Sequence, residues 1–132
     1  MKTLLIVLAL FLTACSQQPA STSFADRAAR AEAHENTPIG NAYITDLFKE
    51  HGEGINKFAG ECYAKTSIQK DTFKLVADIN PSGRIESVVV QPDTATTRCF
   101  TQQIGQLTVT ASRPLGFVDK SFPLVINVNY NK

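Results

Sequence analysis

Histidine, cysteine and acidic side chains are the groups in this chain that could hold a metal or take part in catalysis. The chain has two histidines, His34 and His51. Three acidic residues lie close to the second along the sequence: Asp46, Glu50 and Glu53. Neighbouring positions on a helix point in different directions, so we do not expect these side chains to converge on one metal ion.

His34 lies between Glu32 and Glu35 in a charged, alanine-rich segment, and we expect its side chain to be exposed to solvent. The metalloprotease motif H-E-x-x-H, the hydrolase motif G-x-S-x-G and a glycine-rich phosphate loop are all absent from the sequence. We therefore predict that the protein is not an enzyme, and that it uses no metal, no cofactor and no small-molecule substrate.

The first of the three cysteines, Cys15, follows a short apolar run near the start of the chain. Lys2 precedes this run, which covers residues 4–12 and is followed by small residues. A transmembrane helix needs about 20 apolar residues, roughly twice as many as this run has. A positive start, a short apolar stretch and a small-residue cleavage site are the layout of a secretory signal, so we expect the protein to be exported.

Residues 12–15, LTAC, resemble the lipobox of bacterial lipoproteins, in which a small residue precedes an invariant cysteine. The resemblance implies that the signal is cut after Ala14, that Cys15 carries diacylglycerol and that its new amine is acylated. Several acyl chains hold a protein firmly on a membrane. Ser16 follows the cysteine, which resembles the sorting signal for the outer membrane of Gram-negative bacteria. The alternative is an ordinary signal peptide with an incidental cysteine.

Lipidation of Cys15 leaves Cys62 and Cys99 as an even pair in an exported protein. Because exported compartments are oxidising, a disulfide between these two cysteines is the default expectation. The alternatives are two free buried thiols or one reactive cysteine. The sequence has no C-x-x-C motif, and no histidine neighbours either cysteine, so we favour the disulfide.

Composition limits the size and the partners of the protein. The 132 residues include 13 basic and 12 acidic side chains, which gives a formal net charge of +1. Nucleic-acid binding needs a basic patch or stripe, and this balance does not favour one. The length fits one domain, so we expect a single small fold that does not bind nucleic acid.

We expect three segments along the chain: a signal peptide (1–14), a lipid-anchored tether (15–40) and a folded domain (41–132). The tether begins with a Ser/Gln/Pro-rich stretch, which is typical of a flexible linker. Residues 24–35 have high helix propensity because they are rich in alanine. Phe24 is their only large apolar residue, so we expect this helix to be solvated or frayed, with little to bury.

Apolar residues from Tyr43 to Cys62 recur at three- and four-residue steps, the pattern of an amphipathic helix. Gly52 and Gly54 weaken the middle of this helix, where a kink or a break into two pieces is consistent with the sequence. Residues 73–79 then alternate between apolar and polar side chains, which indicates a half-buried strand.

The sequence NPSG at residues 80–83 predicts a turn, because proline presets its φ and glycine can take a positive φ. Residues 84–91 return as the second strand of a β-hairpin. Thr94 is suited to cap a short helix whose apolar face includes Cys99. Residues 122–130 alternate again and form the last strand.

The resulting order of helix, strand, strand, helix, strand predicts a small α+β fold, a two-layer sandwich. A three-stranded antiparallel sheet would carry both helices on one face. Cys62 ends the first helix and Cys99 lies in the second, so their disulfide would join the two helices.

From about Ile44 to Tyr130, the chain resembles the TonB C-terminal-like domains of the AgmX/PglI type. The matching residues are Cys62-Tyr63, the strand through Ile79, Gly83 to Ile85, Val88 to Thr94, Cys99 and the FPLVINV of the last strand. This resemblance implies the same fold and a protein-binding role. The chain departs from the family at LTVTASRPLGF, which replaces an aromatic-x-x-Pro segment. It also lacks the membrane helix and Pro-rich spacer of TonB itself, so the resemblance does not imply energy transduction.

A three-stranded sheet has exposed edges, whose unpaired N–H and C=O groups can pair with an incoming strand. The last strand is uncharged, and we expect it or its neighbour to accept an extended segment of a protein partner. The residues of this candidate edge are Leu124, Ile126, Asn127, Val128, Asn129 and Tyr130. The alternative is that Asn127 and Asn129 simply keep a solvated face polar.

These features predict an outer-membrane lipoprotein that faces the periplasm and whose domain is an adaptor or scaffold in a secretion, motility or transport complex. The alternative is a periplasmic inhibitor or immunity lipoprotein that neutralises a toxin or a lytic enzyme. A tight interface of that second kind favours exposed anchors on loops, and the candidates are Phe117, Asp119 and Lys120.

Overall fold

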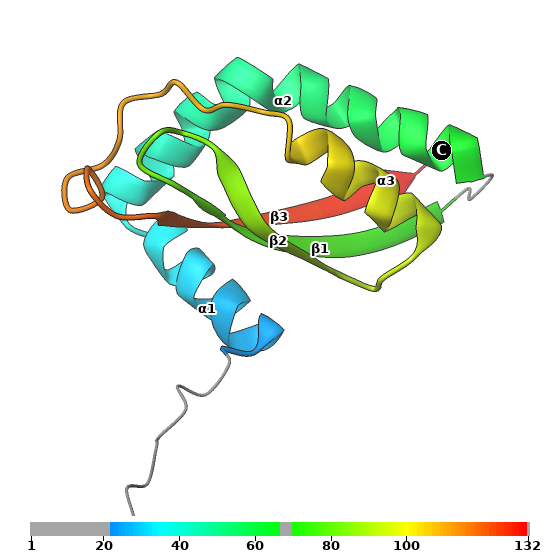
Figure 1. Ribbon diagram of the computed structural model, residues 1–132, viewed down its shortest axis with the longest axis horizontal. Coiled ribbons are helices and arrows are strands. Elements are labelled where there is room, and N and C mark those ends of the chain that lie inside the picture. The colour runs from blue at the N-terminus through cyan, green and yellow to red at the C-terminus, as the bar shows by residue number, and fades with distance from the viewer. Residues whose placement is uncertain (1–21, 67–69, 132) are drawn as a thin grey trace, which may run out of the picture.

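The computed structural model describes residues 22–66 and 70–131, with residues 70, 71, 130 and 131 described by their backbone alone. Its sheet has three antiparallel strands, β1 (Lys70–Ile79), β2 (Ile85–Gln91) and β3 (Phe122–Asn131). β1 lies in the middle, between β2 and β3 (Figure 1). β1 and β3 pair over their whole lengths, whereas β2 pairs with β1 across an irregularity.

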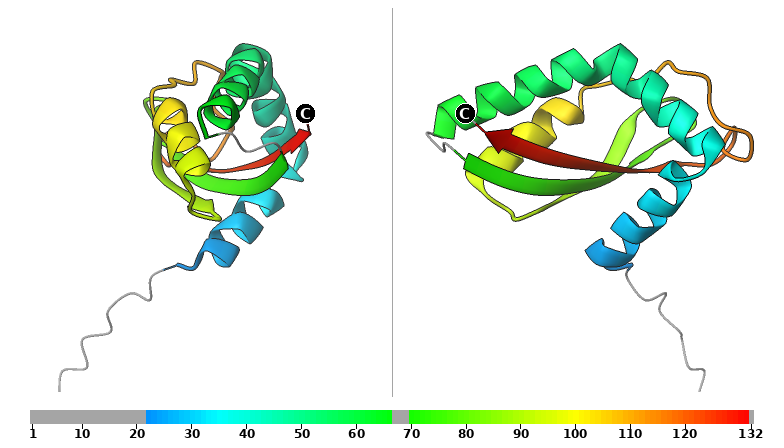
Figure 2. Two further views of the ribbon diagram at one scale, coloured as in Figure 1. Left: turned by 90° about the vertical axis from the view of Figure 1, so that its right-hand side faces the viewer. Right: turned by 180° about the vertical axis from the view of Figure 1, so that it is seen from behind.

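Two helices, α2 (Pro38–Thr66) and α3 (Ala95–Ile104), cover one face of the sheet (Figure 2). The apolar side chains of β1 alternate as predicted and are buried against this layer: Phe73, Leu75, Ala77 and Ile79. The helix α2 runs unbroken through Gly52 and Gly54 and curves over the sheet. It buries Leu47 before these glycines and Ile55 after them, so packing on both sides holds the helix together.

A third helix, α1 (Phe24–Glu35), packs on the opposite face of the sheet (Figure 2). Ala28 and Ala31 are buried there against Val76 of β1 and Val125 of β3. The expectation that this helix has little to bury is therefore wrong. Its alanines let the helix backbone approach the strands closely, so a helix without large apolar residues still has a buried face.

Polar contacts also fix α1 to the sheet. Arg27 donates through Nη2 to Asp78 Oδ2 at 3.1 Å and to the carbonyl oxygen of Ser87 at 2.7 Å. Lys74 of β1 binds Glu32 at 2.9 Å. α1 is thus part of the folded domain, and the expected boundary between residues 40 and 41 falls inside α2. Helices cover both faces of the sheet, so the expected two layers are three.

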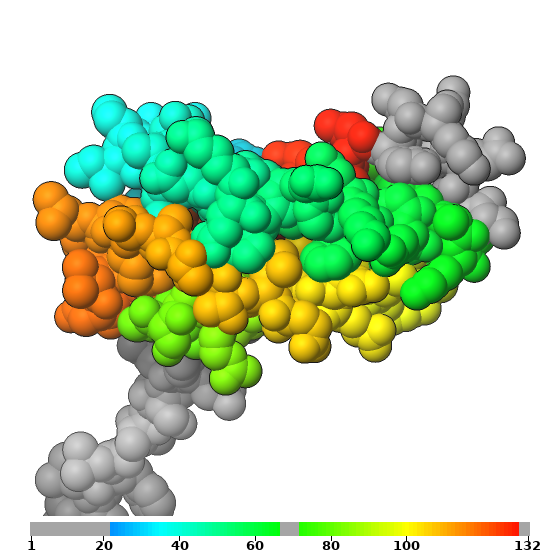
Figure 3. All heavy atoms as spheres, turned by 90° about the horizontal axis from the view of Figure 1, so that it is seen from above, coloured from blue at the N-terminus to red at the C-terminus, as the bar shows by residue number. Residues whose placement is uncertain are grey.

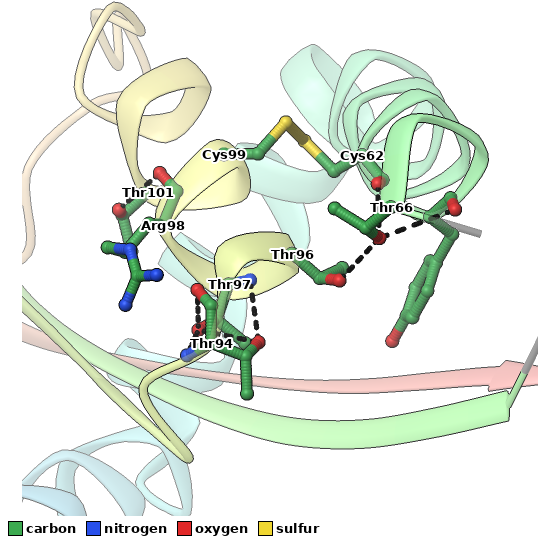
Figure 4. Close-up of a disulfide and its surroundings, with 9 residues drawn as sticks. Cys62, Thr66, Thr94, Thr96, Thr97, Arg98, Cys99 and Thr101 are labelled. Carbon is green, nitrogen blue, oxygen red and sulfur yellow. Dashed lines mark hydrogen bonds between the residues drawn. A yellow bond between two sulfur atoms is a disulfide. The ribbon is translucent and has the colours of Figure 1, made fainter. Parts of the chain in front are cut away.

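The predicted disulfide between Cys62 and Cys99 joins α2 to α3 (Figure 4). It closes a sequence separation of 37 residues, and the two Cα atoms lie 5.6 Å apart. Beside it the hydroxyl oxygens of Thr66 and Thr96 lie 2.6 Å apart, which adds a polar link between the same two helices. The α+β class, the antiparallel sheet and the disulfide are all confirmed.

Local signals at the turn and the cap are confirmed as well. Gly83 has φ +85°, the left-handed conformation that the hairpin turn requires. Thr94 caps α3: its Oγ1 accepts the N–H of Thr97, and Thr97 Oγ1 accepts the N–H of Thr94. In the part of the chain that the structure describes, no helix combines the length and apolarity that crossing a membrane requires.

Candidate protein-docking edge

β3 lies at an edge of the sheet, and its pairing with β1 shows which of its backbone groups point outward. The N–H of Asn80, just after β1, bonds to Arg84 on the side of β2 at 2.9 Å. The even-numbered residues of β1 therefore turn their N–H and C=O groups toward β2, and the odd-numbered ones turn them toward β3. The even-numbered residues of β1 pair with odd-numbered residues of β3. The N–H and C=O groups of these odd-numbered β3 residues therefore face the outer edge of the sheet.

The first half of this edge is closed to another strand. Pro123 stands at an outward position and has no N–H to offer, which is where an edge strand tolerates proline. The next outward N–H, that of Val125, donates to Glu35 Oε1 at 3.3 Å. Glu35 is the last residue of α1, so its carboxylate occupies the place of a carbonyl from an additional strand.

The second half of the edge is open. The outward N–H groups of Asn127 and Asn129 have no hydrogen-bond partner among the residues that the structure describes. Both side chains are exposed and lie on the α1 side of the sheet, beyond the end of the helix contact. Val128, between them, packs against the main core on the α2 side.

A groove of about 470 Å³ runs between α2 and this open half of β3. α2 contributes Phe48, Ile55, Asn56 and Ala59, and β3 contributes residues 126–129. Phe48 is 40% exposed, so the groove has an apolar wall that water reaches. Figure 3 shows part of β3 (red) at the surface along the second half of α2, on the side away from α3 (yellow). Unpaired strand groups next to an apolar groove are what an extended peptide recognises.

The other edge of the sheet is less suited to this role. β2 changes register against β1 between Val76 and Asp78, and Ser87 takes a left-handed φ of 54° there. Such a bulge bends an edge strand and protects it from pairing. At the start of β2, Arg84 already forms a bridge with Thr108. In the described part of the chain, the end of β3 combines a regular strand and open backbone groups with an adjacent apolar groove.

Glu35 lies at the sheet edge, and its surroundings shift the pKa of its carboxylate. Its pKa is raised from the ordinary value, first because burial removes water from the carboxylate and also because Glu32 lies nearby. The N–H of Val125 acts in the opposite direction, since it favours the charged form. No lysine, arginine or histidine of the described residues forms an ion pair with Glu35.

The structure places the predicted edge residues in two groups. Leu124 and Ile126 are buried under α2, and their backbone groups face β1, although Ile126 also lines the groove. Asn127, Val128 and Asn129 form the open half. The backbone of Tyr130 pairs with Asp71, and its side chain lies outside the described residues.

Sequence reasoning missed Glu35 as part of this site. Its role depends on α1 lying against the sheet, and the docking of α1 rests on Ala28 and Ala31, which carry no strong apolar signal. The contact joins residues 90 positions apart in the sequence. The one signal for Glu35 in the sequence is an acidic residue at the end of a predicted helix, and that pattern is common on helices exposed to solvent.

Both histidines make structural contacts that the sequence did not predict. His34 is half-buried, with its ring centroid 5.1 Å from that of Phe117 in an edge-to-face arrangement, so the expectation of an exposed side chain is wrong. His51 Nε2 lies 2.9 Å from the carbonyl oxygen of Thr108. Glu50, next to it, accepts the N–H of Thr110 at 3.0 Å and its hydroxyl at 2.6 Å.

Through these contacts, Glu50 and His51 hold α2 to the segment 108–110, and we call this pair of residues the clasp.

In residues 22–66 and 70–131, no three His, Cys, Asp or Glu side chains are grouped so that they could hold a metal ion. Cys15, the predicted lipid site, lies outside the described residues.

The loop before β3 matches the expected interface patch in part: Asp119 and Lys120 are exposed, but Phe117 is not. Phe117 is half-buried and packs edge-to-face on Phe122, with ring centroids 5.0 Å apart. Leu115 and Val118 are instead exposed, by 82% and 66%. From the sequence, Phe117 was the candidate anchor because aromatic side chains dominate interfaces. In the structure, Phe117 packs against the core instead.

Comparison with known proteins gave no assignment for this arrangement: no protein-family model matches the chain, and no curated protein or solved structure matches it significantly.

Proposed function

We propose that this protein is an adaptor that binds an extended segment of a cell-envelope protein beside the open half of β3. The observation that carries the proposal is the pair of unpaired, outward backbone positions at Asn127 and Asn129 next to the groove under α2. Backbone hydrogen bonds would supply affinity, and side-chain pockets would supply specificity. The domain would belong to the TonB C-terminal-like group of the AgmX/PglI type, as its cysteine pair and hairpin suggest.

We further propose that Cys15 carries the lipid that holds the protein at the outer membrane, facing the periplasm. Support comes from the LTAC sequence, the serine after it and the disulfide between Cys62 and Cys99, since disulfides persist in oxidising compartments. Labelled fatty acid should be incorporated into the parent protein and not into Cys15→Ala. Equal labelling of the two proteins would contradict the lipid anchor at Cys15.

The docking proposal is tested by a proline at the open edge. Because the N–H of Asn129 points away from β1, Asn129→Pro removes an outward donor without breaking the ladder. A photo-crosslinking amino acid at position 127 should capture a partner in intact cells. Adding Asn129→Pro should abolish that product, whereas Asn129→Thr, which keeps the N–H, should preserve it.

A crosslinking residue at Lys57, which is exposed on α2 and does not line the groove, is the positional control. Far-ultraviolet circular dichroism and thermal melting of both Asn129 variants show whether the fold is retained. If the product at position 127 persists in Asn129→Pro while the fold is intact, β3 does not receive the partner by strand pairing.

A second candidate, an inhibitor or immunity lipoprotein, is favoured by the turn that carries Leu115. Phe117 donates its N–H to Pro114 at 3.0 Å, and Gly116 has φ +87°, so Leu115 stands at the tip of a closed turn. Arg113 fixes this turn through bonds to the carbonyl oxygens of Phe117 and Lys120, at 2.7 Å and 2.6 Å. Loss of partner binding in Leu115→Asp, with Asn129→Pro unaffected, would favour this second candidate.

A further inference from the structure

The carboxylate of Glu35 lies at the end of the open half of β3 that is nearer to Val125. Glu35 Oε1 lies 3.3 Å from the nitrogen of Val125, where a strand added beside β3 would place a backbone carbonyl. A segment that pairs with Asn127 and Asn129 therefore meets Glu35 at its next outward position. The segment has to end there, or its next side chain has to suit that carboxylate.

The arginines of α1 and Lys74 of β1 form ion pairs with acidic residues other than Glu35. Arg27 and Arg30 of α1 both bind Asp78, at 3.1 Å and 3.7 Å. Lys74 of β1 binds Glu32 at 2.9 Å. His34, the neighbour of Glu35 in the chain, packs against aromatic rings and has no ion pair among the described residues.

A half-buried carboxylate without a cation is costly, and a positive group brought by a partner relieves that cost. Among the described residues, Glu35 accepts one hydrogen bond, which the N–H of Val125 donates to Oε1. Glu35 Oε2 has no bond within the described part of the chain, so it is free to accept a charged donor from outside.

The two faces of an added strand would meet different surroundings. On the α2 side lies the apolar groove with Phe48, Ile55 and Ala59. On the α1 side lie the exposed side chains of Asn127 and Asn129. Because side chains of a strand alternate between its faces, the matching segment alternates apolar and polar residues.

We propose that the segment docked beside β3 is a short extended peptide with apolar side chains at alternate positions toward α2 and a lysine, an arginine or a free amino terminus beside Glu35. This inference rests on the docking edge proposed above. It adds the chemistry of the partner: the groove selects the apolar residues, and the carboxylate fixes the register of the peptide along the edge.

The test uses isotope-labelled protein, purified as the cell produces it, and synthetic peptides at up to millimolar concentration. The first probe, acetyl-Lys-Val-Thr-Val-Thr-Val-amide, places its lysine beside Glu35 when it runs parallel to β3. The second probe, acetyl-Val-Thr-Val-Thr-Val-Lys-amide, does so when it runs antiparallel to β3. In each matched control peptide, glutamine replaces the lysine. The readout is the shift of the Asn127 and Asn129 amide signals during a nuclear magnetic resonance titration.

One of the lysine peptides should bind roughly three- to tenfold more tightly than its glutamine control, and added salt should shrink the difference. Glu35→Gln keeps an oxygen for the N–H of Val125 but removes the charge, so it should abolish the preference for lysine. Glu53→Gln removes one charge from an exposed site on α2 outside the groove and should keep the preference.

The outcomes separate the two proposals. If the lysine and glutamine peptides shift the Asn127 and Asn129 amides with equal affinity, the role of Glu35 is wrong and the docking edge stands. If the preference for lysine survives in Glu35→Gln, another group recognises the cation and the inference is overturned. If no peptide shifts these amides at millimolar concentration, both the inference and the docking edge fail.

Discussion

Glu50 and His51 are adjacent on α2, and both bind the segment that follows α3. Glu50 accepts the N–H and the hydroxyl of Thr110, and His51 Nε2 contacts the carbonyl oxygen of Thr108. From the sequence these side chains were considered as metal ligands only because they lie near other acids. Their partners lie 57 and 60 residues away along the chain, and the spacing of residues within one helix does not reveal such contacts.

Removal of the Glu50 carboxylate should loosen this clasp in a pH-dependent way. The hydroxyl of Thr110 is the main cause of a lowered pKa at Glu50. A lowered pKa in the folded state gives stability that is present above the ordinary value of 4.5 and is lost as the pH falls through the folded value. Glu50→Ala should therefore cost about 1 kcal/mol of unfolding free energy at pH 7 and less in acid.

The matched control is Glu53→Ala, which changes the same residue type on the exposed side of α2. Denaturant unfolding of both variants and of the parent at neutral and acidic pH measures the difference. An equal loss in the two variants at neutral pH would show that the bonds to Thr110 do not contribute to stability.

Gly83 shows how a single turn residue fixes the end of the hairpin. Its φ of +85° disfavours any side chain, and a Cβ there would collide with the carbonyl oxygen of Val109. Gly83→Ala should lower the unfolding free energy by about 2 kcal/mol or more. Gly54→Ala in α2 has open space around its Cβ and should raise stability by about 0.5–1 kcal/mol, measured by the same denaturant titration.

At the scale of elements, the parts that local patterns encode were predictable. The alternation of β1, the turn at residues 80–83 and the cap at Thr94 depend on residues that are close in sequence. The docking of α1 was not predictable in this way. Its buried face consists of Ala28 and Ala31, and its polar contacts join it to residues 42 to 90 positions away.

The disulfide is the main covalent tie between α2 and α3. It closes a separation of 37 residues, for which the chain-entropy view gives roughly 3–4 kcal/mol of stabilisation. The double substitution Cys62→Ala and Cys99→Ala should lower the unfolding free energy by about that amount. Addition of a reductant should destabilise the parent protein but leave the double variant unchanged, which separates loss of the bond from loss of packing.

The α1 contact should be separable from the rest of the fold. Ala31 is 1% exposed, so Ala31→Glu would bury a charge between α1 and Val76 and should release the helix. Hydrogen exchange should then become fast in residues 24–35 while β1 and α3 keep their protection. Ala33→Glu lies on the exposed side of α1 and should leave the exchange pattern unchanged. Loss of protection throughout the sheet would instead make α1 part of one cooperative core.

At the scale of the whole molecule, the sheet carries helices on both faces, and the first half of each edge strand is protected. The bulge and the bridge to Thr108 protect β2, and Pro123 and Glu35 close the first half of β3. Along β3, residues 127–129 remain open. The sequence indicated this strand because it is uncharged and alternating, but the closed half became visible only once α1 was placed.

A partner strand added beside β3 would form hydrogen bonds with the backbone of Asn127 and Asn129. The most direct measurement is amide hydrogen exchange, residue by residue, in the free protein and in complex with its crosslink-identified partner. We expect the Asn127 and Asn129 amides to exchange fast in the free protein and to become protected in the complex. Protection that appears at Leu115 and Val118 instead, with these two amides unchanged, would contradict it.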